Sequence, residues 1–194
     1  PEGTLAWLHL GQGEAPRRLA QLATRLTRER PGLALLVTGE GGQTPSLDGF
    51  PKGTVADLLP PDRPVALRPF LDHWRPDLAI WTESEFWPCL ILETAARGTP
   101  LLLLNARMSE QSAQRWGKLG KAAAVILDAF AAVQVQDDTS AARLRGFGLS
   151  SDRMAVTGTL KEGTPPPHCN ETALAALTAE IKGRPVWLAA STHV

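Results

Sequence analysis

The sequence predicts an α/β protein built on a doubly wound parallel sheet. Short apolar runs recur along the chain, and helical patterns lie between them. The runs are about four to six residues long, which suits strands better than helices. They are also apolar on both faces, as strands buried inside a parallel sheet are. Such β-α alternation is typical of a doubly wound fold.

The elements follow in order along the chain. Strands are expected at six apolar runs, residues 5–10, 33–38, 77–82, 100–105, 131–136 and 153–158. Helices are indicated where apolar residues share one helical face, at Leu19–Leu26, Val65–Trp74, Leu90–Ala95 and residues 139–145. Residues 161–171, "KEGTPPPHCNE", are rich in proline and polar residues and indicate a linker. A helix at 172–181 and a strand at 185–190 then suggest the start of another domain.

Composition limits the possible functions. The 194 residues are 43% apolar and 21% charged, which is ordinary for a soluble globular domain. The formal net charge is zero, so the chain is no basic nucleic-acid binder. Two cysteines make neither a disulfide framework nor a metal pair. The first residue is not methionine and the last follows a strand-like run, so we expect a piece of a longer protein.

The first candidate site loop is "GQGEAP", residues 11–16. In doubly wound sheets, ligands bind outside the carboxyl ends of the strands. Gly11 and Gly13 permit a tight turn, and Pro16 suits a first helical turn. Glu14 is then either a carboxylate favoured by the helix dipole or a group placed to take a proton from a substrate. A nucleotide-binding loop is the weaker alternative, because the third glycine of that fingerprint is absent.

Two further loops carry polar residues after a strand. In "TESEFWP", Glu83 and Glu85 either begin a helix or orient sugar hydroxyls and tune a neighbour's pKa. In "NARMSE", Asn105 and Arg107 follow the next strand, and Arg107 is suited to an anion or to a carboxylate partner. Ser109 is suited to start a helix. His9, His73 and His168 have no metal spacing and are expected to be structural.

Several motifs in this order resemble the 3-deoxy-D-manno-octulosonic acid (Kdo) transferases of lipopolysaccharide synthesis. They are "WLHLGQGE", "FLDHWRPDLAIWTESEFWP", "GTPLLLLNARMSE", "VTGTLK" and "RPVWLAASTH", and together they span nearly the whole chain. The resemblance implies two Rossmann-like domains with a cleft between them, the GT-B arrangement. Residues 1–163 would be the acceptor-binding domain. Residues 164–194 would be the linker and the start of a truncated donor-binding domain.

The resemblance also implies a reaction, inverting transfer of Kdo from CMP-Kdo to a lipid A precursor, with no metal and no further cofactor. The partners would be these two substrates and the cytoplasmic face of the inner membrane. Glu14 matches the family's general base, and Glu83 and Glu85 match an acidic pair that binds or supports the acceptor. Asn105 and Arg107 match the "NAR" motif, which supports the cleft or contacts an acceptor phosphate.

On the donor side, the resemblance assigns Lys161 in "TGTLK" to the donor phosphate. Ser191, Thr192 and His193 match the donor-side motif, and the piece alone is expected to be inactive. The chain departs from the family pattern in a first loop one residue shorter, in Cys89 after "WP" and in Thr159 of "TGTLK". Residues 114–124 also carry few basic residues for a surface that meets an anionic lipid. The alternative is therefore a catalytically silent paralogue that acts as a binding module.

Overall fold

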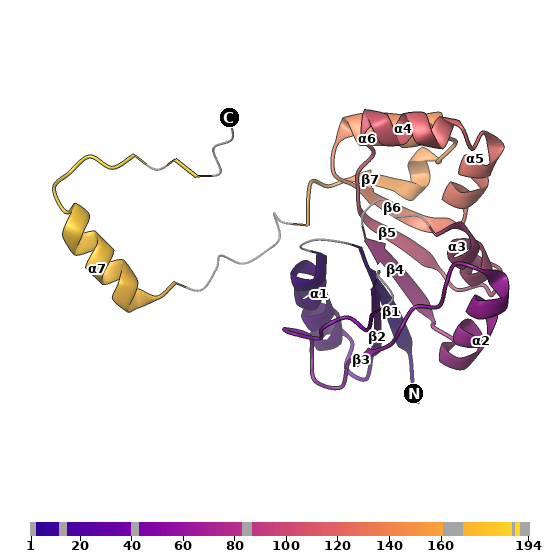
Figure 1. Cartoon of the computed structure of the whole chain (residues 1–194), viewed down its shortest axis with the longest axis horizontal. Helices are drawn as coiled ribbons and strands as arrows, with labels where there is room; N and C mark the ends of the chain where they lie inside the picture. The colour runs from indigo at the N-terminus through magenta and orange to yellow at the C-terminus, as the bar shows by residue number, and fades with distance from the viewer. Residues whose placement is uncertain are drawn as a thin grey trace. The chain divides into compact units, whose positions relative to one another are not determined.

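The chain divides into two compact units, Pro1–Thr164 and Pro165–Val194. The computed structural model describes residues 3–11, 15–39, 43–82, 87–160, 169–187 and 189–190, without the side chains of residues 15–18. Every strand that it describes lies in the first unit, and the second unit contains helix α7 (Figure 1).

The described strands of the first unit form one sheet with the order β3-β2-β1-β4-β5-β6-β7. The strands are β1 (Leu5–Leu10), β2 (Ala34–Gly39), β3 (Val55–Ala56), β4 (Leu78–Thr82), β5 (Leu101–Ala106), β6 (Phe130–Val135) and β7 (Met154–Val156). Every pair of neighbours is parallel. The predicted doubly wound parallel sheet is therefore confirmed, with all six expected strands present.

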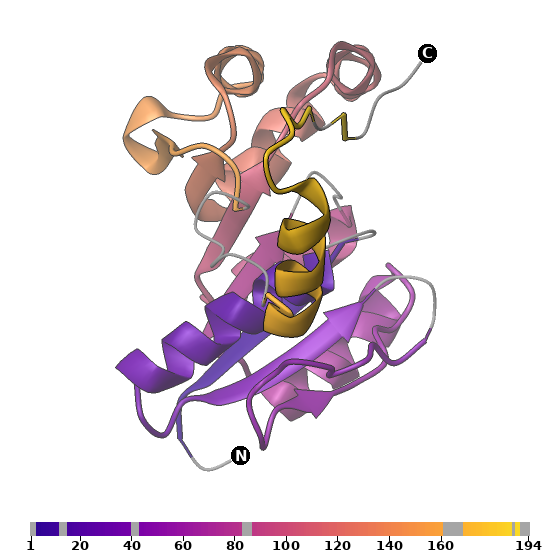
Figure 2. The ribbon, with the colours of Figure 1, turned by 90° about the vertical axis from the view of Figure 1, so that its left-hand side faces the viewer.

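Helices cover both faces of the sheet. The elements are α1 (Ala15–Glu29), α2 (Pro64–Trp74), α3 (Pro88–Ala95), α4 (Glu110–Gly117), α5 (Lys121–Asp128), α6 (Asp138–Gly146), the 3-10 turn η1 (Ser151–Arg153) and, in the second unit, α7 (Glu171–Ile181). Helix α1 lies on one face, and α2, α3 and α5 lie on the other (Figure 1). Figure 2 looks onto the α1 face. On that face, Leu102 and Leu104 of β5 are only partly buried and Ala132 of β6 is exposed.

Alternate residues of the strands point into two hydrophobic clusters. All six residues of β1 are buried. Trp7 belongs to the cluster under α2 and α3, which also holds Phe70 and Trp81. Leu8 belongs to the cluster under α1, with Leu19. Because each side of β1 faces a helix layer, both of its faces must be apolar, which is the pattern that the sequence shows.

The structure also contains elements that the apolar pattern did not predict. Strand β3 has two residues and is too short to show a period. Helix α4 has no fully buried residue, and its contact with the core is limited to the partly buried Ala113 and Trp116, so only its start at Ser109 was indicated. Helix α2 is where it was expected, but Val65 is 85% exposed, because the helix turns Leu67, Phe70 and Leu71 inward instead.

The second unit contains the expected helix. Asn170 caps α7 by accepting a hydrogen bond from the backbone N–H of Ala173 at 3.0 Å. The strand predicted at 185–190 is absent from its described residues, 185–187 and 189–190. A strand needs a neighbouring strand for its backbone hydrogen bonds, and no described residue supplies one to this stretch.

Candidate functional site

The candidate site lies where the strand order of the sheet reverses. From β1 the chain proceeds outward to β2 and β3, and it then returns to β4 on the other side of β1. β1 and β4 are therefore the neighbours at the topological switch point. In open α/β sheets, ligands bind in the crevice outside the carboxyl ends of these strands. The loops after β1 and β4 are the ones in which the sequence placed Glu14, Glu83 and Glu85.

A buried threonine joins the beginnings of these two loops. The hydroxyl of Thr82, the last residue of β4, accepts a hydrogen bond from the backbone N–H of Gly11 at 3.3 Å. The same hydroxyl donates to the carbonyl of His9 at 3.2 Å. Thr82 is 1% exposed, so this connection is shielded from water. The loops that follow β1 and β4 therefore start side by side.

Only part of the predicted site can be placed. Asn105 and Arg107 lie within the described residues. The other predicted residues lie outside them: Glu14, Glu83, Glu85, Lys161, Ser191, Thr192 and His193. Their assignments remain predictions.

Asn105, near the end of β5, is hydrogen-bonded to residues that follow β6 and β7. It is 3% exposed and has the left-handed backbone angle φ of 58°. Its side-chain Oδ1 accepts a hydrogen bond from the backbone N–H of Leu160 at 3.2 Å, and its carbonyl accepts one from Nε2 of Gln136 at 2.9 Å. Asparagine tolerates this conformation better than most residues do. The contacts thus join the end of β5 to residues after β6 and β7, and they suit the expected structural support of the cleft.

Arg107 is exposed and lies within electrostatic reach of Asp137, the residue that caps α6. The hydrogen bond from the backbone N–H of Ser140 is the main reason that the pKa of Asp137 is lowered, and the charges of Arg107 and Arg143 add to this effect. Of the two partners considered for Arg107, the structure therefore places a carboxylate nearby. Binding of an anion by Arg107 remains a prediction.

A buried polar cluster lies at the switch point, and sequence reasoning assigned it no function. His9, in β1, is fully buried, and its Nδ1 lies 3.0 Å from the hydroxyl of Thr38 in β2. That hydroxyl also accepts a hydrogen bond from Nε1 of Trp7 at 2.9 Å. Burial lowers the pKa of His9 to about 4, so the imidazole is neutral at pH 7.

Two nitrogens of this cluster have no hydrogen-bond partner among the described residues. They are Nε2 of His9 and Nε1 of Trp81, and both are buried. The two rings lie 5.0 Å apart on adjacent strands, in register. A buried donor without a partner costs about 1–3 kcal/mol, so such groups in a native fold call for an explanation. The expectation that His9 is structural accounts for its burial and for the Thr38 contact, but not for Nε2.

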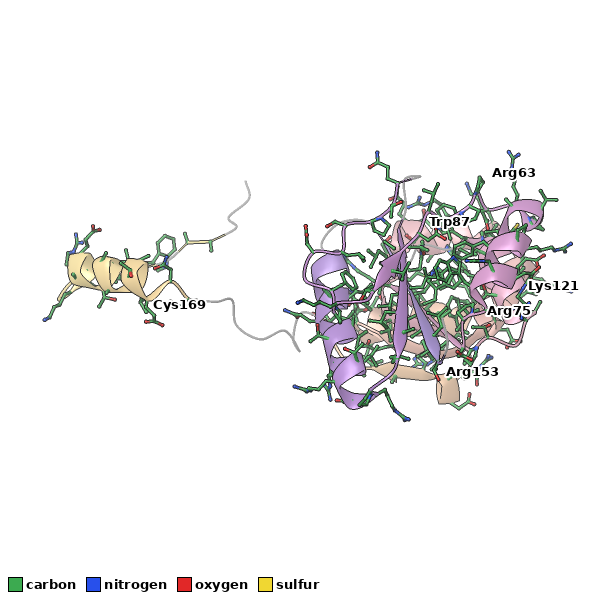
Figure 3. The ribbon with its side chains drawn as sticks, turned by 90° about the horizontal axis from the view of Figure 1, so that it is seen from below. Arg63, Arg75, Trp87, Lys121, Arg153 and Cys169 are labelled. Carbon is green, nitrogen blue, oxygen red and sulfur yellow. The ribbon has the colours of Figure 1, made fainter. Side chains whose placement is uncertain are left out.

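The start of α3 borders the cluster. Trp87, which Figure 3 labels, precedes this helix. It makes an edge-to-face contact with His9, with the two ring centroids 6.1 Å apart. Trp87 packs against the core, and Pro88 occupies the first turn of the helix. The helix amides are capped from another loop, since the carboxylate of Asp62 accepts hydrogen bonds from Leu90 at 2.8 Å and Cys89 at 3.3 Å. Burial, with smaller effects of nearby carboxylates, raises the pKa of the Cys89 thiol, so it is a poor nucleophile.

The described residues include no group of three or more histidine, cysteine, aspartate or glutamate side chains suited to hold a metal ion. None of the described helices is both long enough and apolar enough to span a membrane.

Comparison with known proteins identifies the family. Residues 1–163 match the family model described as 3-deoxy-D-manno-octulosonic-acid transferase (kdotransferase). The chain is 33% identical over 193 residues to the 3-deoxy-D-manno-octulosonic acid transferase of Rickettsia felis, with 98% of this chain and 41% of the relative covered. It is 30% identical over 181 residues to the enzyme of that name from Haemophilus influenzae, with 89% and 41% covered. The chain thus spans about two fifths of the length of these relatives.

Solved structures share the fold. UDP-GlcNAc 2-epimerase from Neisseria meningitidis, bound to UDP-GlcNAc, aligns with a TM-score of 0.58 at 10% identity. The alignment covers 93% of this chain and 53% of the epimerase chain. A putative UDP-N-acetylglucosamine 2-epimerase from Listeria monocytogenes has a TM-score of 0.59 at 12% identity, covering 89% and 50%. At these identities the likeness concerns the fold alone, a Rossmann-like domain of the GT-B class. By its sequence, the chain belongs to the 3-deoxy-D-manno-octulosonic acid transferase family.

Proposed function

We propose that the protein containing this chain transfers Kdo from CMP-Kdo to a lipid A precursor, and that residues 1–163 form its acceptor-binding domain. Family membership over these residues supports the reaction class. The observation that carries the site is the Thr82 connection, which starts the loops of Glu14, Glu83 and Glu85 side by side at the switch point. Residues 164–194 would lead into a donor-binding domain.

In the proposed reaction, an acceptor hydroxyl oxygen forms a bond to the anomeric carbon of Kdo. The bond from that carbon to the phosphate oxygen of CMP breaks, and its electron pair leaves with CMP. The hydroxyl proton must go to a base, because an alkyl hydroxyl is a poor nucleophile at pH 7. We assign this base to Glu14. Attack from the side opposite to CMP inverts the anomeric centre.

The remaining assignments follow the family motifs. Glu83 and Glu85 would orient the acceptor or support the base, and Arg107 would contact an acceptor phosphate. Lys161 would face the donor phosphate, and residues 191–193 would belong to the donor site. The proposal includes no metal or other cofactor, and it predicts that a chelator such as EDTA leaves the rate of transfer unchanged.

The turn between α4 and α5 is our candidate for the surface that meets the inner membrane on its cytoplasmic side. Leu119 is 48% exposed and Val125 is 56% exposed. The exposed cations Arg115, Lys118 and Lys121 flank them (Figure 3 labels Lys121). Apolar side chains beside cations suit a surface of anionic lipid.

The decisive experiment is transfer by the full-length protein with CMP-Kdo and a lipid A precursor, in wild type and Glu14→Gln. Glutamine keeps the size of glutamate but cannot accept a proton at neutral pH. Loss of a general base should lower turnover by a factor of about 10²–10⁴ with the fold intact. A matched control is Glu29→Gln at the end of α1, whose exposed ion pair with Arg25 contributes little.

A purely structural Glu14 predicts a different result. Removing one favourable charge from a helix start costs about 0.3–1 kcal/mol of stability and leaves turnover nearly unchanged. Near-normal activity of folded Glu14→Gln would therefore remove Glu14 from the base role and direct attention to Glu83 and Glu85. A wild-type protein that binds the lipid without any transfer would instead support the silent paralogue.

A further inference from the structure

The unpartnered nitrogen of His9 belongs to a buried chain of hydrogen bonds. Thr38 accepts a hydrogen bond from Nε1 of Trp7, so its own hydroxyl proton needs an acceptor. Among the described residues, the group that offers one is Nδ1 of His9, 3.0 Å away. A neutral imidazole that accepts at Nδ1 carries its proton on Nε2. The chain of bonds therefore fixes the tautomer, and it leaves Nε2–H as a donor with no acceptor among the described residues.

The surroundings of His9 keep the imidazole neutral. Its described contacts come from Thr38 of β2, Trp81 of β4 and Trp87 before α3, and none of these is charged. Strands β2 and β4 contain no titratable residue. Burial alone accounts for the lowered pKa.

The titratable groups near the start of α3 are engaged or neutral. Asp62 accepts hydrogen bonds from two backbone amides of the helix. The raised pKa of Cys89 keeps its thiol protonated at neutral pH. Neither therefore takes the proton of His9.

The Nε2–H donor of His9 lies at the edge of the sheet where the proposed reaction requires a carboxylate base. His9 is the penultimate residue of β1, and its register partner is Trp81 of β4, so the Nε2–H is at the switch point between the two acidic loops. Trp81 presents a second buried N–H there without a partner among the described residues. An oxygen acceptor is the group that such donors lack, and the proposed reaction requires a carboxylate at this edge.

We propose that His9 is a positioning residue for sugar transfer, and that its Nε2–H donates a hydrogen bond to the carboxylate that takes the acceptor's proton. This inference rests on the proposed function. A neutral N–H donor holds the carboxylate in place and stabilises its ionised form, which lowers the pKa of the base. Thr38 acts one step further away, because it fixes the tautomer that makes Nε2 the donor.

The kinetic test uses the full-length protein and measures kcat between about pH 4.5 and pH 9. His9→Leu removes the donor, so kcat should fall by about 10- to 100-fold, by analogy with the loss of hydrogen-bond partners that orient metal ligands. The fall of kcat on the acid side of the pH profile (the acid limb) should also move to higher pH in this variant. The reason is that the pKa of the base rises when its ionised form loses a hydrogen-bond donor. His9→Gln retains N–H donors on a side chain of similar length and should restore most of the rate and the position of the limb.

A matched pair of threonine variants separates positioning from folding. Thr38→Val removes the hydroxyl that fixes the tautomer, and it should move the acid limb in the same direction as His9→Leu. Thr94→Val removes a hydroxyl that is equally buried but bonds to the carbonyl of Leu90 within α3. It should lower the melting temperature without moving the limb. A folded His9→Leu protein with an unmoved acid limb would overturn the proposal.

A second readout needs no activity. Nitrogen-15 spectra of the histidines in this chain, with His9→Gln for assignment, should show His9 neutral and protonated on Nε2 from about pH 5 to pH 8. Titration of His9 near its ordinary pKa, or a proton on Nδ1, would refute the proposed donor. Absence of transfer in the wild type would count against the proposed function, and the spectra would still decide the state of His9.

Discussion

At the scale of single residues, two residues share a left-handed backbone conformation but have different roles. Among the described residues, Asn105 and Arg75 are the non-glycine positions with positive φ, 58° and 46°. Arg75 ends α2 on the surface, where glycine is the usual choice. Asn105 is buried, and its side chain binds the backbone of Leu160. The sequence placed Asn105 at the site edge, but contact with a segment 55 residues away could not be read from local patterns.

Substitutions at these two positions should therefore have opposite effects. Asn105→Gly relieves the backbone strain but leaves the N–H of Leu160 without its acceptor, which should cost about 1–3 kcal/mol in the free energy of unfolding. Asn105→Ala should cost about 1–2 kcal/mol more, because alanine also strains the left-handed backbone. Arg75→Gly is the control and should be neutral or slightly stabilising. Urea denaturation of the three variants measures these differences, and equal stability of Asn105→Gly and wild type would contradict the structural role.

At the scale of elements, some helices are capped by a residue next to them in the sequence, and one is capped by a distant residue. Ser109 and Asp137 cap the helices that follow them by accepting from a backbone N–H three residues on, a local pattern. Helix α3 instead takes its cap from Asp62, more than 25 residues earlier. Nothing in the local sequence marks Asp62, because the contact exists only after α2 and α3 have packed together.

The Asp137 cap of α6 should make the free energy of unfolding depend on pH in the acid range. The amide of Ser140 holds the pKa of Asp137 below its ordinary value of 3.8. A group whose pKa is lowered by folding contributes stability above its unfolded pKa and loses it as the pH falls through the folded pKa. Asp137→Asn keeps a capping oxygen, so at pH 6 it should cost less than about 1 kcal/mol. This difference should shrink as the pH falls below the ordinary value of 3.8, and it should vanish only below the lowered pKa of the folded state.

Urea unfolding between about pH 2.5 and pH 6 measures this difference between wild type and Asp137→Asn. The control is Asp48→Asn, which removes a carboxylate on an exposed loop without removing a helix cap. A constant difference between wild type and Asp137→Asn across the whole range would show that the Asp137 charge does not contribute through its pKa.

At the scale of the whole molecule, the apolar runs were sufficient to predict the sheet but not the buried chemistry within it. The central strands β1, β2 and β4 are buried on both faces, so their apolar composition alone reports their environment. His9 was interpreted as a structural residue because its spacing from the other histidines suits no metal site. Its significance comes from Thr38 and Trp81, which the strand order brings beside it. Such a cluster becomes visible only when the order of the strands is known.

The proposed membrane surface is also a property of the folded molecule, and it can be tested by charge reversal. Lys118→Glu with Lys121→Glu should weaken binding of the full-length protein to vesicles that contain anionic lipid, by about 1 kcal/mol or more per residue at low ionic strength. Binding of the wild type should weaken as salt is added, because screening reduces the attraction. Vesicles of neutral lipid should show little difference between the two proteins.

A charge-matched control separates local contact from the effect of net charge. Arg28→Glu with Arg30→Glu changes the net charge equally, at the end of α1 on the opposite side of the sheet (Figure 1). Flotation or sedimentation with vesicles measures the bound fraction of each variant. If contact is made through the turn between α4 and α5, only the lysine pair should lose binding, because electrostatic attraction decays within about 10 Å at 0.1 M salt. Equal losses in both variants would mean that overall charge, and not this turn, attracts the protein to the lipid.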